Sequence, residues 1–295
     1  LFFFFFKIKQ LRRNINEFNP DIVHVHQSIF FFCYSIKACG KKYPLVVTAW
    51  GSDVLSTPTK GIMYRQLIKY VMSHAHYFTS DAVYMADVMR KYAGPHKPEI
   101  LIANFGIDIT PGNFEKERLV YSNRQLTPLY RIDKVIEIFY ELISSGELNS
   151  DWKLAIAATG SEEEHLKSLV HKLKIENSVN FVGWVGREQN TTLYQKASIF
   201  ISIPESDATS ISLLEAMACG CIPVVSNLPA NREWIIDNKN GCIMQPDEKD
   251  ILLRAIRLNI QKVQEINSEI IQREGTKEAN KIKFIDFYDK VIHAH

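Results

Sequence analysis

The first third of the chain alternates short β-rich runs with amphipathic helical runs. Period-two alternation of β-branched residues predicts strands, and apolar residues recurring every three or four positions predict helices. The predicted strands are 21–25, 45–48, 77–80 and 99–102. The predicted helices are 3–18, 28–39, 61–73 and 81–92, the last capped by Asp81, with a loop at 49–60. Strands that alternate with helices predict a parallel, doubly wound sheet.

The polar segment 110–117, TPGNFEKE, interrupts this pattern and is predicted to be a linker. The alternation then restarts, with strands at 119–122, 153–157, 179–182, 198–202, 222–225 and around Cys242. Helices are predicted at 131–144, 162–173, 187–196, 231–236 and within 247–294. The sequence thus predicts domains at 1–112 and 113–276, with 277–295 as a helix returning to the first. Ligands of such folds bind at the carboxyl ends of the strands, here in the cleft between two domains.

A polar loop and a short apolar helix separate two predicted strands within residues 203–226. Pro204 ends the first strand, and Gly220 ends the helix. Asp207 and Glu215 are eight positions apart, so their carboxylates share a side of the helix if it begins early enough. If Asp207 instead precedes the helix, the first-turn amides face the same cavity, which suits a diphosphate.

Composition limits the function classes only slightly. The 295 residues suffice for two domains, and 46% hydrophobic with 23% charged residues is typical of a globular protein. A net charge of +2 gives no reason to expect a nucleic-acid partner. Five cysteines, an odd number, predict reduced thiols in a cytoplasmic protein, and their spacing predicts no metal site.

An apolar run, Leu1 to Phe6, precedes the basic residues Lys7, Lys9, Arg12 and Arg13. The run is far shorter than the about 20 residues that cross a membrane. One interpretation is a peripheral anchor at the inner membrane surface. We favour the other, a helix packed on its own domain with its basic residues in water. The charge order is not that of a signal peptide, and the missing initiator methionine suggests a fragment.

The segments DIVHVH, TAWGSDV and 203–226 together resemble the family 4 glycosyltransferases, most strongly over 119–245. In that family's signature, a Glu, seven intervening residues and a second Glu lead into an EAMACG-type helix. Here Asp207 and Glu215 occupy the two acidic positions. The resemblance implies a GT-B fold, with two Rossmann-like domains facing a cleft. Relatives begin with a strand and a Gly-rich loop that this chain lacks, so its first domain is expected to be incomplete.

The resemblance implies roles for both acidic signature residues and for the amides between them. Asp207 would hold hydroxyls of the donor sugar, the amides of Thr209, Ser210 and Ile211 would meet the sugar or diphosphate, and Glu215 would bind the ribose hydroxyls. Carboxylates accept paired hydroxyl donors, and helix-start amides neutralise phosphate. The residues alone leave ordinary alternatives, a helix cap for Asp207 and a solvated helix position for Glu215.

Arg124 stands where the family has an arginine that contacts the donor phosphates and stabilises the leaving diphosphate. The family's lysine about five residues later is absent, because Leu129 and Tyr130 occupy that place. We expect Arg131 to substitute; the alternative is a hydrogen bond from Tyr130 to phosphate.

Two turns of the second domain fit a nucleotide in the same family. The turn containing Gly160 corresponds to a Gly-rich turn, and the backbone of Val182, Gly183 and Trp184 would edge the base. A packing role for Trp184 is the alternative.

The first domain is expected to hold the acceptor. The expected acceptor-side residues are His26, Trp50, Gly51, Ser52, Asp53 and Asn104. In relatives a histidine at the position of His26 lies near the reacting centre, and a structural, hydrogen-bonded histidine is the alternative. Trp50 either stacks on a sugar face or packs.

The resemblance thus implies a metal-independent, retaining glycosyltransferase of polysaccharide biosynthesis, with catalytic residues Arg124, Asp207, Glu215 and His26. It needs no cofactor besides a UDP- or GDP-linked sugar donor, and its acceptor is a glycan or lipid-linked hydroxyl. Two rivals stay open. One is a sugar-nucleotide epimerase of the same fold, and the other is a non-catalytic nucleotide-sugar binder.

Overall fold

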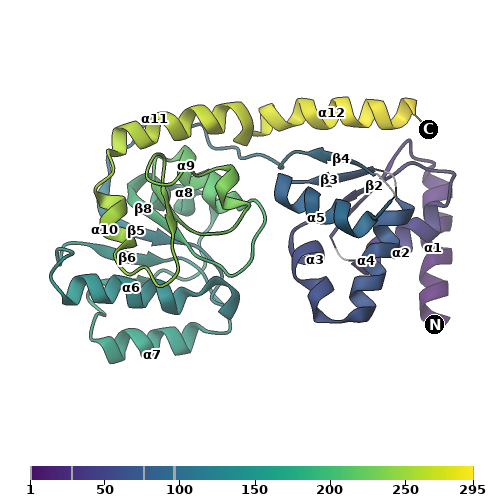
Figure 1. Cartoon of the computed structure of the whole chain (residues 1–295). Coiled ribbons are helices and arrows are strands. Elements are labelled where there is room, and N and C mark those ends of the chain that lie inside the picture. Colours follow the sequence, from purple (N-terminus) through teal and green to yellow (C-terminus); the bar gives the residue numbers. More distant parts are fainter. Residues whose placement is uncertain (1, 28, 76, 96–97, 295) are drawn as a thin grey trace. The chain divides into compact units, whose positions relative to one another are not determined.

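The protein consists of two α/β units, each built on its own parallel sheet (Figure 1). The structure, a computed structural model, describes residues 2–27, 29–75, 77–95 and 98–294. Leu1, which begins the predicted apolar run, and Ser28, which begins the predicted second helix, lie outside the described residues. The first unit comprises Leu1–Phe105, Ser206–Thr209 and Glu278–His295, and the second comprises Gly106–Glu205 and Ser210–Lys277.

The first unit carries a parallel sheet in the order β1-β2-β3-β4. Its strands are β1 (Val23–His26), β2 (Leu45–Thr48), β3 (Tyr77–Ser80) and β4 (Glu99–Ile102). Its helices are α1 (Phe2–Phe18), α2 (Ile29–Cys39), α3 (Ser52–Leu55), α4 (Ile62–His74), α5 (Val83–Ala93) and most of α12 (Lys277–His293), with a 3₁₀ turn at Thr57–Lys60. Val46 of β2 packs against Phe287 and Val291, which joins α12 to this sheet.

The second unit carries a larger parallel sheet in the order β10-β9-β8-β5-β6-β7. Its strands are β5 (Glu117–Ser122), β6 (Lys153–Ile156), β7 (Val179–Phe181), β8 (Ala197–Ser202), β9 (Ile222–Ser226) and β10 (Cys242–Met244). Its helices are α6 (Ile132–Ser144), α7 (Glu163–Leu173), α8 (Arg187–Lys196), α9 (Ile211–Ala218), α10 (Ile251–Ile256) and α11 (Ile260–Ile270). Short 3₁₀ turns lie at Pro128–Tyr130 and Asn231–Glu233, and a π-helical turn spans Ile271–Gly275.

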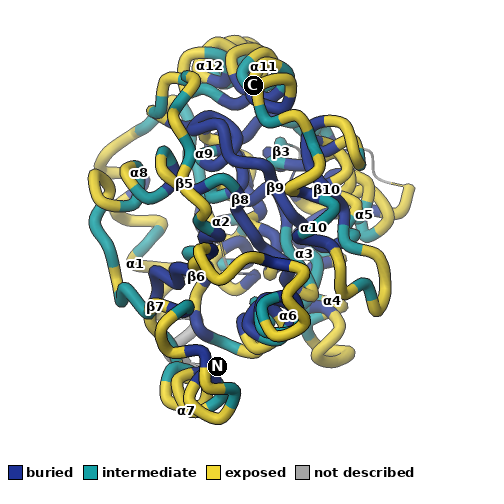
Figure 2. Tube along the Cα trace, turned by 90° about the vertical axis from the view of Figure 1, so that its left-hand side faces the viewer, coloured by how far each residue is buried: buried dark blue, intermediate teal, exposed yellow. Residues whose placement is uncertain are grey.

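Burial on both faces explains the apolar strands of this unit. Every residue of β9 and all of β8 except Ser198 are buried, so these strands are mostly dark blue in Figure 2. Helix α6 buries one stripe, including Ile132, Val135 and Phe139, against the sheet. The alternation predicted from the sequence is therefore confirmed as a pair of parallel α/β units.

Backbone pairing decides to which unit the connecting segment belongs. The amide of Ile107 donates to the carbonyl of Gly275 at 2.9 Å, and the amide of Lys277 donates back to Ile107 at 3.1 Å. These bonds hold residues 106–112 in the second unit. In the structure the second unit begins after Phe105 and ends at Lys277, whereas the sequence places these boundaries after residues 112 and 276.

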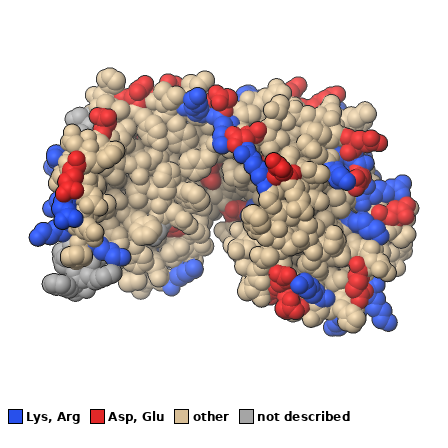
Figure 3. All heavy atoms as spheres, turned by 180° about the vertical axis from the view of Figure 1, so that it is seen from behind, with Lys and Arg blue, Asp and Glu red and all other residues tan. Residues whose placement is uncertain are grey.

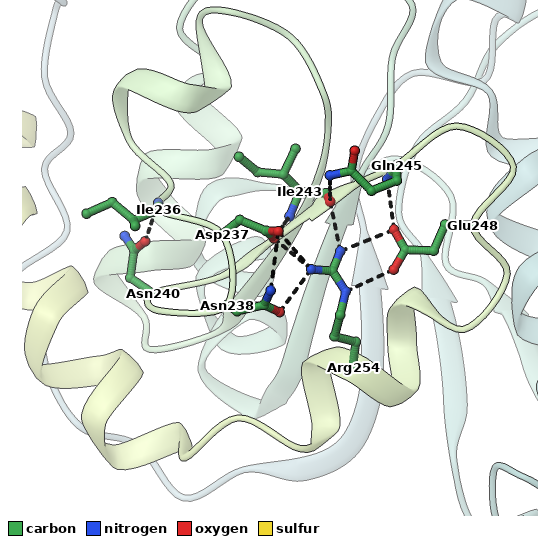
Figure 4. A network of polar contacts seen from close by, with 8 residues as sticks. All are labelled: Ile236, Asp237, Asn238, Asn240, Ile243, Gln245, Glu248 and Arg254. Atoms are coloured by element: carbon green, nitrogen blue, oxygen red, sulfur yellow. Dashed lines mark hydrogen bonds and ion pairs between the residues drawn. The ribbon is translucent and has the colours of Figure 1, made fainter.

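A charged network fixes the chain around β10 (Figure 4). Arg254 of α10 donates from Nη1 to both carboxylate oxygens of Asp237, at 2.8 and 2.9 Å, and from Nε to Glu248 at 2.9 Å. Its Nη2 reaches the carbonyl of Ile243, within β10, at 2.8 Å. One guanidinium thus ties two loops and a strand to α10.

Two local predictions for the first unit are wrong. Asp81 does not cap a helix, because α5 starts after Ala82 and this N-cap has no side-chain bond. Residues 49–60 are not a plain loop, since they contain α3 and a 3₁₀ turn. Among the described residues, no helix has the length and apolar character needed to cross a membrane. On the face drawn in Figure 3, basic and acidic side chains are interspersed.

Candidate functional site

In the second unit, a buried arginine meets the start of a helix. Arg124, two residues beyond β5, is only 9% exposed. Its Nη1 donates to Ser210 Oγ at 2.5 Å, and its guanidinium lies 4.4 Å from the centroid of the Tyr130 ring. Ser210 is the N-cap of α9 and accepts from the amide of Leu213. A fixed cation therefore adds to the partial positive charge of a helix N-terminus, which is the electrostatic pattern of an anion site.

Asp207 precedes α9, which is the second of the two placements that the spacing left open. Helix α9 begins at Ile211 and its cap is Ser210, so Asp207 neither lies on the helix nor caps it. Asp207 instead accepts from the amide of Ala208 at 3.1 Å within a segment that belongs to the first unit. In the same segment, the Thr209 hydroxyl donates to the carbonyl of Asp81 at 2.6 Å. Ile211 is 40% exposed at the start of the helix.

Glu215 of α9 is part of a polar network rather than a solvated helix face. Its carboxylate accepts from Asn190 Nδ2 at 3.5 Å. Asn190 Oδ1 accepts in turn from the Tyr121 hydroxyl at 2.6 Å and from Asn123 Nδ2 at 3.1 Å. Burial raises the pKa of Glu215. The network holds an acid whose charge lacks full hydration, which is common at binding sites.

A cavity of about 270 Å³ adjoins this network. It is lined by Asn123, Gln125, Ala157, Ala158, Thr159, Trp184, Val185 and Asn190. Trp184 is 79% exposed, so it does not pack in the core. No described group hydrogen-bonds Asn123 Oδ1, a buried acceptor at this cavity. The lining thus combines an aromatic ring with amide groups, a mixture that suits a nucleoside.

Backbone geometry explains the glycines of the two turns that are expected to contact a nucleotide. Gly183 adopts φ 77°, which favours glycine, and the amide of Val182 before it donates to the carbonyl of Ile156 at 2.9 Å. A Cβ at Gly160 would overlap the carbonyl of Leu126. Gly160 therefore permits the close approach of two loops.

The structure places Tyr130, not a second cation, against the Arg124 guanidinium. Arg131 adopts the left-handed conformation before α6, with φ 52°. It lines a surface cavity of about 250 Å³ together with Glu162 and Glu205. Its substitution for the missing lysine stays a prediction.

In the first unit, three aromatic rings gather beyond the carboxyl ends of β1, β2 and β4. The ring centroids of His26 and Trp50 are 6.3 Å apart, and the Phe105 centroid lies 5.7 Å from His26 and 5.9 Å from Trp50. Trp50 is 53% exposed and Phe105 43% exposed. Burial lowers the pKa of His26.

His24, two residues before His26, has a structural role. Its Nδ1 shares a hydrogen bond with the Tyr288 hydroxyl of α12 at 2.7 Å, and its Nε2 with the Thr48 hydroxyl. Burial, with a smaller contribution from His26, lowers the pKa of His24 to about 4. His24 is therefore neutral at physiological pH, and it links β1 to α12.

One buried carboxyl group lies beside Trp50. Asp53 is buried and accepts from the amide of Trp50 at 3.0 Å. Between them, Gly51 has φ 95°, where a Cβ would crowd Ala208, and Ser52 is exposed at the start of α3. Asn104 accepts from Asn280 of α12 at 3.2 Å, and both residues are buried.

Asp81 lies next to β3 and is the acid that the sequence pattern misassigned. Burial raises the pKa of Asp81 to about 7, opposed by a bond from the Thr209 amide and reinforced by the charges of Asp207 and Asp53. No described group hydrogen-bonds the buried Oδ1 of Asp81. A buried carboxyl oxygen of this kind is open to a ligand or a water molecule.

Comparison with known families decides the membership of the chain. Residues 107–274, more than half of the chain, match the family described as glycosyl transferases group 1. The chain belongs to the group 1 glycosyl transferases. Residues 3–82 also match the glycosyl transferase 4-like family.

Relatives of this group 1 glycosyl transferase are distant. N-acetyl-alpha-D-glucosaminyl L-malate synthase of Bacillus anthracis is 24% identical over 218 residues, covering 68% of this chain and 55% of the relative. GDP-mannose:cellobiosyl-diphosphopolyprenol alpha-mannosyltransferase of Xanthomonas oryzae is 22% identical over 249 residues, covering 78% and 62%. The chain thus spans less than two thirds of each of these relatives.

Solved structures establish the GT-B fold. The pneumococcal O-GlcNAc transferase GtfA, in complex with UDP and GlcNAc, superposes with a TM-score of 0.80 at 14% identity, covering 96% of this chain and 60% of that one. Anabaena HepE in complex with UDP gives 0.79 at 14% identity, covering 96% and 82%. At these identities the likeness shows the fold alone.

Sequence reasoning missed several polar residues of this group 1 glycosyl transferase. Asn190 and Tyr194 lie four positions apart on α8; Asn190 donates to Glu215, and both residues accept from Asn123. Asn190 appears in the sequence only as part of a glycosylation sequon. The spacing of an amide and a phenol on one helix face was the available signal.

Proposed function

We propose that the second unit binds a nucleotide sugar and that the protein transfers its glycosyl group to a hydroxyl of a glycan or lipid-linked acceptor. The observation that carries this proposal is the Arg124–Ser210 hydrogen bond, which fixes a guanidinium at the start of α9. A diphosphate there would meet a permanent cation and helix-start amides. The UDP complexes of GtfA and HepE, which share the fold, support a nucleotide donor.

The rest of the nucleotide follows from the neighbouring groups. Glu215 would accept two hydrogen bonds from a ribose diol, because an ionised carboxylate accepts up to four and the bond from Asn190 leaves capacity for them. The base would enter the cavity beside Trp184.

The chemistry needs a stabilised leaving group more than a protein nucleophile. In the proposed step, the bond between the anomeric carbon and the diphosphate oxygen breaks, and the acceptor oxygen bonds to that carbon from the same face. The acceptor proton passes to the departing diphosphate, so configuration is retained. Arg124 would stabilise the charge that develops on the diphosphate, without a metal ion.

The test compares two arginines that differ in burial. Arg124→Ala should lower kcat by roughly 10²- to 10³-fold, as loss of a preorganised charge donor does. Arg118→Ala is the control, because Arg118 lies on β5, the strand that precedes Arg124, in an exposed pair with Asp151. Transfer would be measured as nucleotide release and glycoside formation, with and without EDTA. Undiminished transfer by Arg124→Ala rejects the site, and a rate that EDTA abolishes rejects metal independence.

One observation favours a second candidate, a nucleotide-sugar binder without transferase activity. Tyr130 occupies the position against Arg124 where a second cation would be expected to help the leaving group. Nucleotide binding without any transfer or donor hydrolysis would select this candidate.

A further inference from the structure

A partly buried lysine lies where two helices of the second unit end. Lys116, just before β5, donates from Nζ to the carbonyl of Tyr194 at 3.0 Å and to the carbonyl of Cys219 at 2.6 Å. Tyr194 is in the last turn of α8, and Cys219 is the C-cap of α9. Carbonyl groups at the end of a helix have no partner within the helix. One ammonium group therefore caps the C-terminal ends of two helices.

The positive charge of this lysine matches its surroundings. The C-terminal end of a helix carries a partial negative charge, so a cation is stabilised there without a carboxylate. The ring centroid of Phe114 lies 5.7 Å from Nζ, and Cys221 Sγ lies 4.0 Å from it. The Cys221 thiol also donates to the Tyr194 carbonyl, at 3.1 Å. The ammonium group is thus held by α8, by the turn after α9 and by its own segment.

The same two helices carry the polar network of the candidate nucleotide site. Helices α8 and α9 pack against each other (Figure 1). Asn190 of α8 donates to Glu215 of α9 at 3.5 Å. The hydroxyl of Tyr194 accepts from Asn123 at 2.7 Å. The amide of Cys219 donates to the carbonyl of Glu215 at 3.0 Å. Each carbonyl that the lysine holds therefore belongs to a residue bonded directly to the network.

The geometry makes one half of the site sensitive to the packing of these helices. The bond between Asn190 and Glu215 is at the upper limit of a hydrogen bond, so a small displacement of α8 along α9 would break it. The N-terminal end of α9 is fixed separately, because Ser210 accepts from Arg124. Lys116 acts at the opposite end of that helix. The groups expected to bind the nucleoside therefore depend on Lys116, and those expected to bind the diphosphate do not.

We propose that Lys116 is a positioning residue of the donor site, which fixes α8 against α9 so that Asn190 and Glu215 are in place for the nucleoside. It acts through the two helix ends and not by touching the nucleotide. The inference rests on the proposed function for the identity of the ligand. It gives a binding role to residues 110–117, whose composition predicted only a linker.

The experiment measures the binding of UDP, GDP and inorganic pyrophosphate by the full chain, using calorimetry at a temperature where each variant is folded. Lys116→Met removes the ammonium group and keeps an apolar side chain of similar length. It should weaken binding of the preferred nucleotide about tenfold and leave pyrophosphate binding unchanged. Lys153→Met is the matched control, because Lys153 donates to the carbonyl of Asn177 at 3.0 Å from an exposed position on β6.

A conservative variant separates positioning from a role in stability alone. Lys116→Arg keeps the charge and both donors and should retain most of the nucleotide affinity. A residue that only stabilised the fold would change Tm and leave the affinity of the folded protein unaltered. Lys116→Gln keeps a neutral donor, and it decides the question if Lys116→Met does not fold. We expect it to bind the nucleotide about threefold more weakly than wild type does.

The outcomes separate this inference from the proposed function. If wild type binds a nucleotide and the folded Lys116 variants without the charge bind it equally well, the positioning role is wrong and the donor site stands. An equal loss of nucleotide and pyrophosphate affinity also overturns the positioning role, because it indicates a general disturbance of the unit. Failure of both nucleotides to bind wild type rejects the proposed donor site, and the positioning role with it.

Discussion

Removing Arg254 should destabilise the second unit strongly, because one side chain hydrogen-bonds four residues, Asp237, Asn238, Ile243 and Glu248. Its side chain is 22% exposed, and that of Glu248 is 11% exposed. In Arg254→Ala, Glu248 would keep its charge without its partner, and the carbonyl of Ile243 would lose its 2.8 Å donor while retaining the bond from Gln245 Nε2 at 3.3 Å. Breaking a buried ion pair in this way costs about 3–5 kcal/mol.

Asp237, the other acidic partner of Arg254, contributes less to the expected loss of stability. Its side chain is 33% exposed, so solvent screens the pair, and we assign it no more than about 1 kcal/mol. Glu248 also retains the bond from the amide of Gln245, which lowers the loss. An expected total of about 3–4 kcal/mol corresponds to a fall in Tm of about 10 °C for a domain of roughly 150–250 residues.

Calorimetry can resolve the transition of the second unit from that of the first. Arg118→Ala is the matched control, since the Arg118 and Asp151 side chains are 58% and 64% exposed and such a pair contributes little. Arg254→Lys should fall between the two, because an ammonium cannot reproduce the forked contacts. If Arg254→Ala and Arg118→Ala lower Tm equally, the network does not stabilise the fold as reasoned.

Three further changes test particular positions. Gly160→Ala should cost about 1–3 kcal/mol through overlap with a neighbouring carbonyl, seen as a lower Tm. Ser210→Ala should cost about 1 kcal/mol through the lost cap and weaken nucleotide binding, because Arg124 loses a partner. Burial raises the pKa of Asp81 to about 7, so the folded protein holds this proton more tightly than the unfolded chain does. The resulting contribution to the free energy of unfolding is complete below about pH 4 and is lost as pH rises through 7. Asp81→Asn should therefore be more stable than wild type at pH 8, with the advantage disappearing toward pH 4; an advantage independent of pH would contradict this assignment.

The fold could be predicted because its elements depend on local periodicity. Strands such as β9 are buried on both faces and therefore read as unbroken β-branched runs, and the buried stripe of α6 repeats at helical spacing. Parallel pairing follows from the alternation itself. The order of the strands and the packing of α12 on the first sheet depend on contacts between residues that are far apart in the sequence. Periodicity carries no information about such contacts.

The site was only partly predictable for the same reason. Arg124 and Glu215 stand at recognisable positions, but their partners are distant in the chain. Ser210 lies 86 residues from Arg124, and Asn190 lies 67 residues from Asn123. Asp81 looked like a helix cap because an acid preceded a helical run. The chain places it instead at the carboxyl edge of a sheet, where burial decides its chemistry.

Glu215 shows how such a network couples binding to protonation. Burial raises the pKa of Glu215 in the unliganded protein, whereas a bound diol would donate to the ionised form and lower it again. By linkage, nucleotide affinity should fall as pH decreases toward the raised pKa, because binding must then expel a proton. The affinities for UDP and GDP should be measured from pH 5 to 8 in wild type and in Glu215→Gln. The difference between the two proteins removes the pH dependence that comes from protonation of the phosphates themselves. We expect Glu215→Gln to bind more weakly and to lose this component of the pH dependence while retaining its thermal stability, since the neutral amide avoids the desolvated charge. A variant that binds as wild type does at every pH would show that Glu215 does not contact the nucleotide.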